Sequence, residues 1–176
     1  GKNSGGVGEV VQNLVYFQNN LGCTSDLWFP SNESRQAEVA NISAINPNNL
    51  FPFATIEKFG IGFPFSILFK RRHVEKNYDL IHQHGLFLLN SAFTNSLKNI
   101  KKVISPHGFI ESEKLSISKR KKDLAFLLYE RENLKNCDCL VACSEQEAIG
   151  FREFGLKQPI GILPNGINDQ MFQNDL

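Results

Sequence analysis

The sequence predicts an α/β fold in which helices flank a parallel sheet. Helical and extended patterns alternate along the chain, as they do in proteins built from βα units. Three extended segments run into short glycine-containing turns, namely His84-Gly85, Pro106-His107-Gly108 and Pro164-Asn165-Gly166. Ligands of doubly wound sheets bind beyond the carboxyl ends of the strands, so these turns are the first places to look for a site. We therefore expect a Rossmann-like sheet.

The composition is that of an ordinary globular domain. The chain has 176 residues, of which 41% are hydrophobic and 21% charged, and its formal net charge is +1. This balance gives no reason to expect nucleic acid as a partner. No apolar run approaches the roughly 20 residues that a membrane-spanning helix needs.

The cysteines indicate free thiols rather than a metal site. Three of the four lie in CDCLVAC, as Cys137, Cys139 and Cys143, and the fourth is Cys23. The C-x-C-x3-C spacing differs from the C-x2-C pairs of zinc sites, so no metal is predicted. We interpret Cys139–Ala142 as a buried strand in which cysteine acts as a small hydrophobic residue. Free thiols suit the reducing cytoplasm, which is the expected location.

The first half of the chain contains one clear helix. Apolar residues recur at helical spacing over Val7–Leu21, and Gly22 ends the pattern. Asp26–Phe29 is predicted as a short strand. The region Ser31–Pro64 has a weak pattern, and we expect a variable excursion with one or two strands there. Phe65–Lys76 is predicted as a helix with a basic end.

The second half alternates more regularly. Ser144 and Glu147 fit a capping box, in which Ser144 accepts from the backbone three residues on and Glu147 reaches back. The helix that they open is expected to end at Gly155. The other predicted elements are strands at Asp79–Gln83, Lys102–Ser105, Cys137–Ala142 and Pro159–Leu163, and helices at Leu88–Leu97 and Ser118–Asn136.

The glycine turn Gly5–Gly8 opens the first predicted helix. Glycine lets the backbone approach a ligand closely, and a helix N-terminus offers free N–H groups to a phosphate. Val11 stands where a dinucleotide fingerprint needs Gly or Ala, and no P-loop lysine follows. A plain helix-opening turn remains an alternative. Only Gly1–Ser4 precede the turn, so we expect the first strand of the sheet to be missing.

Two histidines follow predicted strand ends. His84 and His107 each precede a glycine at the edge where ligands bind in parallel sheets. Imidazole can donate to a ligand hydroxyl there or exchange a proton near neutral pH, so both are predicted as catalytic residues. The alternative is a structural role. His82 lies within the strand and is predicted as a packed core residue.

Two basic runs, Lys70–His73 and Lys119–Lys122, are predicted to be solvated helix faces. Contact with a membrane or with a phosphate-bearing acceptor is the alternative.

As an ordered set, these motifs resemble the N-terminal domain of family 4 glycosyltransferases, which have the GT-B architecture of two Rossmann domains. The resemblance covers most of the chain outside Ser31–Asn77, and it is closest to bacterial enzymes that build exopolysaccharide or lipopolysaccharide. The matching pieces are GGVGEVVQNL, YDLIHQHGLF, ISPHGFIE, KKDLAFLLYERENL, CLVACSEQEAIGFREFG and PIGILPNGIN.

The resemblance implies retaining transfer of a hexosyl group from a nucleotide-sugar donor to a glycan or lipid-linked acceptor, in bacterial surface polysaccharide synthesis. No cofactor or metal is required, and peripheral contact with the inner membrane is a further expectation. The implied contacts to the donor diphosphate come from Gly6, Val7 and Gly8. His84 and His107 would line the cleft near the transferred sugar and the acceptor, while Asn165 and Gly166 would lie where the cleft meets the hinge.

The resemblance also implies a domain organisation. Residues 1–168 correspond to the mainly acceptor-binding N-terminal domain, and residues 169–176 begin the interdomain hinge. The donor-binding C-terminal domain, with its Arg/Lys pair and Glu-x7-Glu motif, is expected to be absent, which would leave the fragment inactive alone. Glu145 and Glu153 share the x7 spacing but lie on one predicted helix without the glycine-rich loop. Two alternatives stay open: a nucleotide-sugar epimerase of the GT-B type, and a non-catalytic module that binds a glycan or a partner.

Overall fold

The computed structural model describes residues 5–30, 45–53, 56–58, 61–63, 67, 69–86, 89–108 and 130–166. Most of the predicted helix Ser118–Asn136, the second basic run and the predicted hinge at residues 169–176 lie outside these residues.

Helix α1 (Gly5–Asn20) leads into strand β1 (Leu27–Pro30). The helix stops before Gly22, as predicted, and Gly22 has a left-handed φ of 87°. The N–H groups of Gly22 and Cys23 donate to Asn19 O and Gln18 O at 3.1 and 2.9 Å. This is the bond pattern of a Schellman motif, which satisfies carbonyls that the helix end would leave open.

The excursion after β1 contains three described strands and one short helix. The 3-10 helix η1 (Pro47–Asn49) precedes β2 (Leu50–Phe53), which pairs in parallel with β1. Strands β3 (Ile56–Lys58) and β4 (Ile61–Phe63) form a separate antiparallel pair. The region therefore contains three described strands, where its weak sequence pattern predicted one or two.

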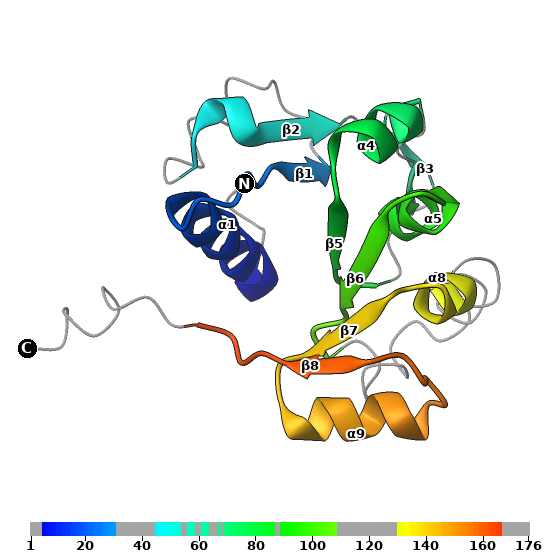
Figure 1. Ribbon diagram of the computed structural model, residues 1–176. Coiled ribbons are helices and arrows are strands. Elements are labelled where there is room, and N and C mark those ends of the chain that lie inside the picture. Colours follow the sequence, from blue (N-terminus) through cyan, green and yellow to red (C-terminus); the bar gives the residue numbers. More distant parts are fainter. Residues whose placement is uncertain are drawn as a thin grey trace, which may run out of the picture.

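A four-stranded parallel sheet forms the second half of the molecule, with strand order β5-β6-β7-β8 (Figure 1). Helices connect consecutive strands, as parallel pairing requires. The strands are β5 (Leu80–His84), β6 (Lys101–Ser105), β7 (Cys139–Ala142) and β8 (Ile160–Ile162). The helices are α4 (Arg71–Asn77), α5 (Leu89–Ser96), α8 (Arg131–Lys135) and α9 (Glu145–Glu153).

The predicted α/β class is confirmed, with two corrections. The parallel strands form two sheets rather than one, because β1 pairs only with β2 among the described strands. Within the predicted helix Phe65–Lys76, Ile67 is helical, a turn follows at Phe69 and Lys70, and α4 begins at Arg71, so the basic residues lie at the start of α4 and not at its end.

No backbone pairing between described strands joins the two parallel sheets, but side-chain contacts do. Trp28 on β1 stacks on Phe51 of β2, with ring centroids 4.9 Å apart. Its indole N–H donates to Tyr78 Oη at 3.2 Å, and the Tyr78 hydroxyl donates to Asp26 Oδ2 at 2.6 Å. Burial and Asp26 raise the pKa of Tyr78 to about 12, so this hydroxyl stays protonated as a donor.

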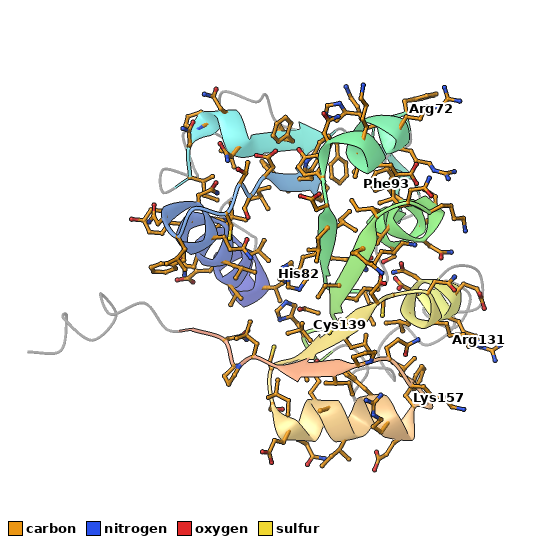
Figure 2. All side chains as sticks on the ribbon, in the orientation of Figure 1. Arg72, His82, Phe93, Arg131, Cys139 and Lys157 are labelled. Carbon is orange, nitrogen blue, oxygen red and sulfur yellow. The ribbon has the colours of Figure 1, made fainter. Side chains whose placement is uncertain are left out.

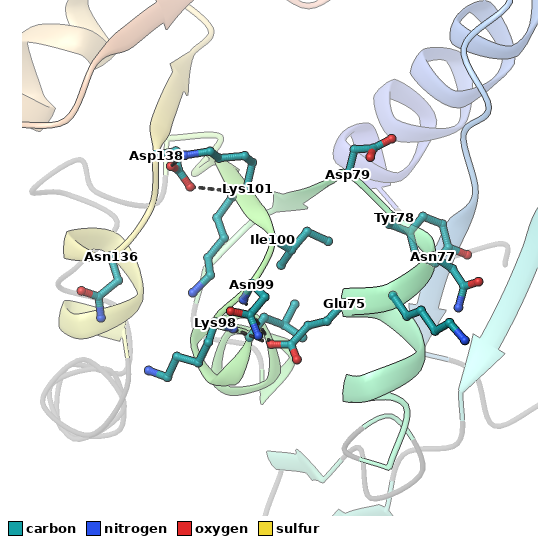
Figure 3. Close-up of a pocket in the computed structure, with 13 residues that line it drawn as sticks. Glu75, Asn77, Tyr78, Asp79, Lys98, Asn99, Ile100, Lys101, Asn136 and Asp138 are labelled. Carbon is teal, nitrogen blue, oxygen red and sulfur yellow. Dashed lines mark hydrogen bonds and ion pairs between the residues drawn. The ribbon is translucent and has the colours of Figure 1, made fainter.

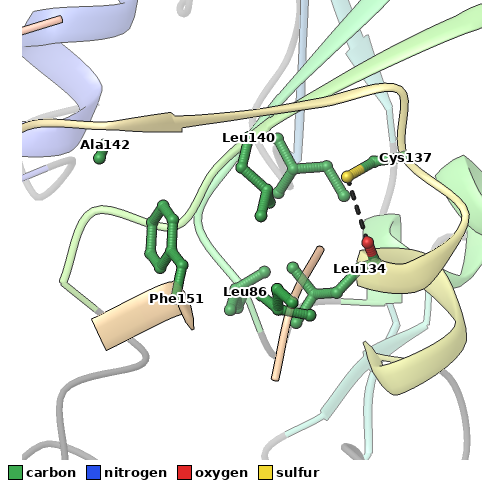
Figure 4. Packing of buried hydrophobic residues seen from close by; sticks show 8 residues of the cluster. Leu86, Leu134, Cys137, Leu140, Ala142 and Phe151 are labelled. Atoms are coloured by element: carbon green, nitrogen blue, oxygen red, sulfur yellow. Dashed lines mark hydrogen bonds between the residues drawn. The ribbon is translucent and has the colours of Figure 1, made fainter. Parts of the chain in front are cut away.

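One hydrophobic cluster holds α8 and α9 against the four-stranded sheet (Figure 4). Phe151 of α9 and Leu134 of α8 are fully buried against Ile104 and Leu140 of the central strands. Helices α8 and α9 therefore cover the same face of the sheet. Figure 1 shows α1 on the other side of these strands from α5 and α8. None of the described helices has the length and apolarity that crossing a bilayer demands.

Candidate functional site

His84 ends strand β5, and the pleat of the strand places His82 on the same face. The two rings have centroids 4.1 Å apart, and His82 Nε2 lies 2.7 Å from Ser105 Oγ on β6. In Figure 2, His82 lies on the side of the sheet toward α1. His82, predicted as a packed core residue, is partly buried, and its ring packs against that of His84.

Gln83 points to the opposite face and anchors the turn that follows β5. Its buried side chain donates to Gly85 O at 2.9 Å and to Ser91 Oγ at 2.8 Å, and it accepts from Asn133 Nδ2 at 2.9 Å. The N–H of Gly85 donates to Ser105 O at 2.8 Å. The turn is therefore held from α5, from α8 and from the neighbouring strand.

His107 reaches His84 through an uncommon backbone conformation. It is the one described residue other than glycine with a positive φ, at 54°, and Gly108 follows with 74°. The left-handed region costs a residue with a Cβ on the order of 1 kcal/mol. His107 Nε2 lies 2.9 Å from His84 Nδ1, with the rings stacked at 5.2 Å. The structure thus brings the two predicted catalytic histidines into direct contact.

The next two strand ends extend the cluster. Cys143 follows β7, and its Sγ lies 3.4 Å from His107 Nδ1. Asn165 follows β8, and its Oδ1 accepts from Cys143 Sγ at 3.4 Å. Asn165 is exposed, as is its neighbour Gly166, for which no contact with the histidines is seen among the described residues. Side chains from all four strand ends therefore meet at one edge of the sheet.

Glu147 holds two of these loops together. It is 5% exposed, and its carboxylate accepts from Gly108 N and from Cys143 N, both at 2.6 Å. Its own N–H donates to Ser144 Oγ at 3.1 Å, which confirms the predicted serine cap. In a full capping box the Glu147 carboxylate would also accept from the N–H of Ser144. Here it accepts from the N–H groups of Gly108 and Cys143 instead.

Burial keeps the imidazoles uncharged. It lowers the pKa of His84 to about 2, with smaller contributions from His82 and His107. It lowers the pKa of His82 to about 4, and His107 adds to that shift. The pKa of His107 is also lowered by burial, although Glu147 opposes the shift. Burial and the nearby Glu147 carboxylate raise the pKa of the Cys143 thiol. Near neutral pH each ring carries one proton, and so does the sulfur.

Such a cluster suits a ligand rich in hydroxyl groups. A neutral imidazole offers one donor and one acceptor, which is what a hydroxyl group can use. The cluster itself carries no cation to balance an anionic ligand. Among the described residues, no group of three His, Cys, Asp or Glu side chains is arranged to hold a metal ion.

The three residues predicted at the donor diphosphate lie on a different element. Gly6, Val7 and Gly8 belong to the first turn of α1, which begins at Gly5. The glycine stretch is therefore part of the helix rather than a turn before it. A Cβ built on Gly6 would meet no atom within 4 Å, so the space beside it is open.

A hollow of about 750 Å³ lies at the opposite edge of the sheet (Figure 3). It is lined by residues at the amino ends of the strands, among them Asp79, Lys101 and Asp138. Lys101 and Asp138 pair with each other at 2.8 Å, and Glu75 accepts from Lys98 N at 2.6 Å. Ligands of doubly wound sheets bind at the carboxyl edge, so we place the functional site at the histidines despite this hollow.

Comparison with protein-family models settles the family. The model of Glycosyltransferase Family 4 matches residues 4–171. The chain belongs to glycosyltransferase family 4. The match takes in every residue of the histidine cluster and the glycine stretch of this family 4 domain.

Two further comparisons add less. Part of a sucrose-phosphate synthase from Thermosynechococcus elongatus resembles the family 4 chain, with 18% identity and a TM-score of 0.41. The alignment covers 85% of this chain and 97% of that one. A comparison with curated proteins gave no match.

Proposed function

We propose that this family 4 domain is the acceptor-side half of a retaining GT-B glycosyltransferase. The enzyme would transfer a hexosyl group from a nucleotide sugar to a glycan or lipid-linked acceptor in bacterial surface polysaccharide synthesis. The observation that carries the proposal is the uncharged cluster of His82, His84 and His107 at the carboxyl edge of a parallel sheet. Hydroxyl groups are the ligands that such a cluster recognises best.

The remaining site residues take supporting roles in the proposal. Gly6, Val7 and Gly8 face the donor diphosphate, because a helix N-terminus without bulky side chains offers free N–H groups to a phosphate. Asn165 and Gly166 mark the start of the hinge toward the donor-binding domain. The enzyme works in the cytoplasm, with peripheral contact to the inner membrane where a lipid-linked acceptor is used.

Replacing His84 or His107 by alanine in the intact enzyme is expected to lower kcat/KM for transfer about tenfold, the value of one lost hydrogen bond. His73→Ala is the matched control, since His73 is exposed on α4. The assay follows nucleoside diphosphate release over a panel of nucleotide sugars and acceptors, with products identified by mass spectrometry.

Three outcomes would contradict the proposal. Unchanged transfer by both histidine variants would remove the site assignment. Free epimerised sugar formed without an acceptor would identify an epimerase. Glycan binding without turnover by the intact protein would identify a non-catalytic module.

Transfer is also expected to proceed without a metal. In the part of the chain that the structure describes, the cluster has no group of three His, Cys, Asp or Glu side chains arranged to hold a divalent cation. The transfer rate should therefore be the same in excess EDTA as in added Mg²⁺. A rate that falls in EDTA and returns with Mg²⁺ or Mn²⁺ would show that the reaction needs a metal.

A further inference from the structure

A continuous chain of hydrogen bonds runs through the cluster from the end of β8 to the end of β5. Asn165 Oδ1 accepts from Cys143 Sγ at 3.4 Å, and Cys143 Sγ contacts His107 Nδ1 at 3.4 Å. His107 Nε2 contacts His84 Nδ1 at 2.9 Å. Four groups at the ends of four strands are therefore linked in series, and the position of a proton on one group constrains the next.

With Asn165 Oδ1 facing the sulfur, only one placement of the protons satisfies every contact along this chain. A carboxamide oxygen only accepts, so the single thiol proton of Cys143 points to Asn165. The contact between sulfur and His107 then needs the ring to donate, which places the proton of His107 on Nδ1. His107 Nε2 is left as an acceptor, so His84 must donate from its own Nδ1. The Nε2 of His84 consequently carries no proton.

We propose that Cys143 and Asn165 are positioning residues that hold His107 and His84 in the Nδ1–H form. His84 then presents a bare Nε2 that accepts a hydrogen bond from a ligand hydroxyl. The assignment of that hydroxyl to a sugar acceptor rests on the function proposed above. The tautomers themselves follow from the hydrogen bonds alone.

The surroundings of the chain support this arrangement. His84 Nε2 makes no hydrogen bond within the part of the chain that the structure describes, and it does not belong to the buried atoms left without a partner. Among the described residues, this nitrogen is therefore available to a ligand hydroxyl. Burial lowers the pKa of both rings, which keeps one proton on each, and the raised pKa of Cys143 keeps its proton in place. Glu147 fixes the backbone of Cys143 through the 2.6 Å hydrogen bond to its N–H.

Without Asn165 or Cys143, nothing in the cluster fixes which partner donates in the hydrogen bond between the rings. The reversed arrangement, with protons on both Nε2 atoms, keeps the hydrogen bond between the rings. In Cys143→Ala the two arrangements make equal numbers of hydrogen bonds within the cluster, so about half of the His84 rings should carry the proton on Nε2. A serine at this position has a hydroxyl that both donates and accepts, and it should restore the wild-type form.

The test is nitrogen NMR of the intact protein labelled with 15N-histidine, since protonated and bare ring nitrogens have different shifts. We expect Nδ1–H on His84 and His107 in the wild type, in Cys143→Ser and in the control Cys139→Ala, whose thiol instead bonds to Leu140 O. Cys143→Ala should give the mixture, and Asn165→Ala should move in the same direction. An Nε2–H proton on His84 in the wild type would overturn the proposal, as would unchanged tautomers in both alanine variants.

A kinetic measurement separates this inference from the proposed function. If half of the Cys143→Ala molecules present the wrong tautomer, the apparent KM for the acceptor should rise about twofold, and Cys143→Ser should reverse the rise. Altered tautomers with no effect on transfer would leave the positioning role intact and reject the acceptor contact. Unaltered tautomers would reject the positioning role whatever the kinetics show.

Discussion

Replacing Glu147 by alanine is expected to destabilise the protein by about 3 kcal/mol, because two backbone donors lose a charged acceptor. Gly108 N and Cys143 N both donate to this carboxylate at 2.6 Å, and the side chain is almost fully buried. Hydrogen exchange of these two amides should accelerate by a factor on the order of 100, and the urea midpoint followed by circular dichroism should fall.

The matched control is Glu153→Ala on the same helix. Glu153 is the exposed last residue of α9, so its loss should change the free energy of unfolding by less than about 0.5 kcal/mol. Glu147→Gln keeps one carbonyl acceptor and should lie between the two. Equal stabilities of Glu147→Ala and Glu153→Ala would show that the hydrogen bonds from Gly108 N and Cys143 N to Glu147 contribute nothing to the free energy of unfolding.

Acidification is expected to remove about 3 kcal/mol of stability between pH 6.5 and pH 5, with His82 and His84 each contributing about half. Their pKa values are about 4 and about 2 in the folded protein, against about 6.5 unfolded. In this window the unfolded chain binds more protons than the folded one, so stability rises with pH. The contribution is complete above pH 6.5 and is lost as the pH falls toward the folded values.

The charged groups near these rings do not reverse the sign. Glu147 raises the pKa of His107 but is outweighed by burial. At the opposite edge of the sheet, the carboxyl groups of Glu75 and Asp138 also have lowered pKa values, yet their ordinary values are near 4, so they titrate below the window. His82→Asn and His84→Asn should each flatten the pH dependence of the unfolding free energy. A slope that survives both cluster variants would contradict the assignment.

Local signals made much of the fold predictable. The helix at α1 follows from apolar spacing and from Gly22, whose left-handed conformation needs no distant partner. Ser144 caps α9 as its position in the sequence indicates. The division of the parallel strands into two sheets could not be predicted, because strand pairing depends on contacts between segments far apart in sequence.

Part of the candidate site could be predicted from the rule that ligands bind at the carboxyl ends of parallel strands. The contact between the β6 loop and α9 could not be predicted. His84 and His107 follow strand ends, and the rule for parallel sheets brings them to one edge. The same rule applies to Cys143, but its place in an apolar run favoured the interpretation of cysteine as a small hydrophobic residue. His82 could have been found from its two-residue spacing to His84. The attraction of Glu147 to Gly108 N had no sequence signal, since it depends on how the β6 loop approaches α9.

The packing of Trp28 between the two parallel sheets provides a test of cooperativity. It is the only tryptophan of the chain, and it contacts both Phe51 on β2 and Tyr78 beside β5. Within this chain, indole emission therefore senses whether the two sheets remain joined, while the histidine cluster reports on the four-stranded sheet alone. Coincident unfolding of the two signals would mean that the sheets melt as one unit. Separate transitions would mean that the β1–β2 unit can detach while the histidine edge stays assembled.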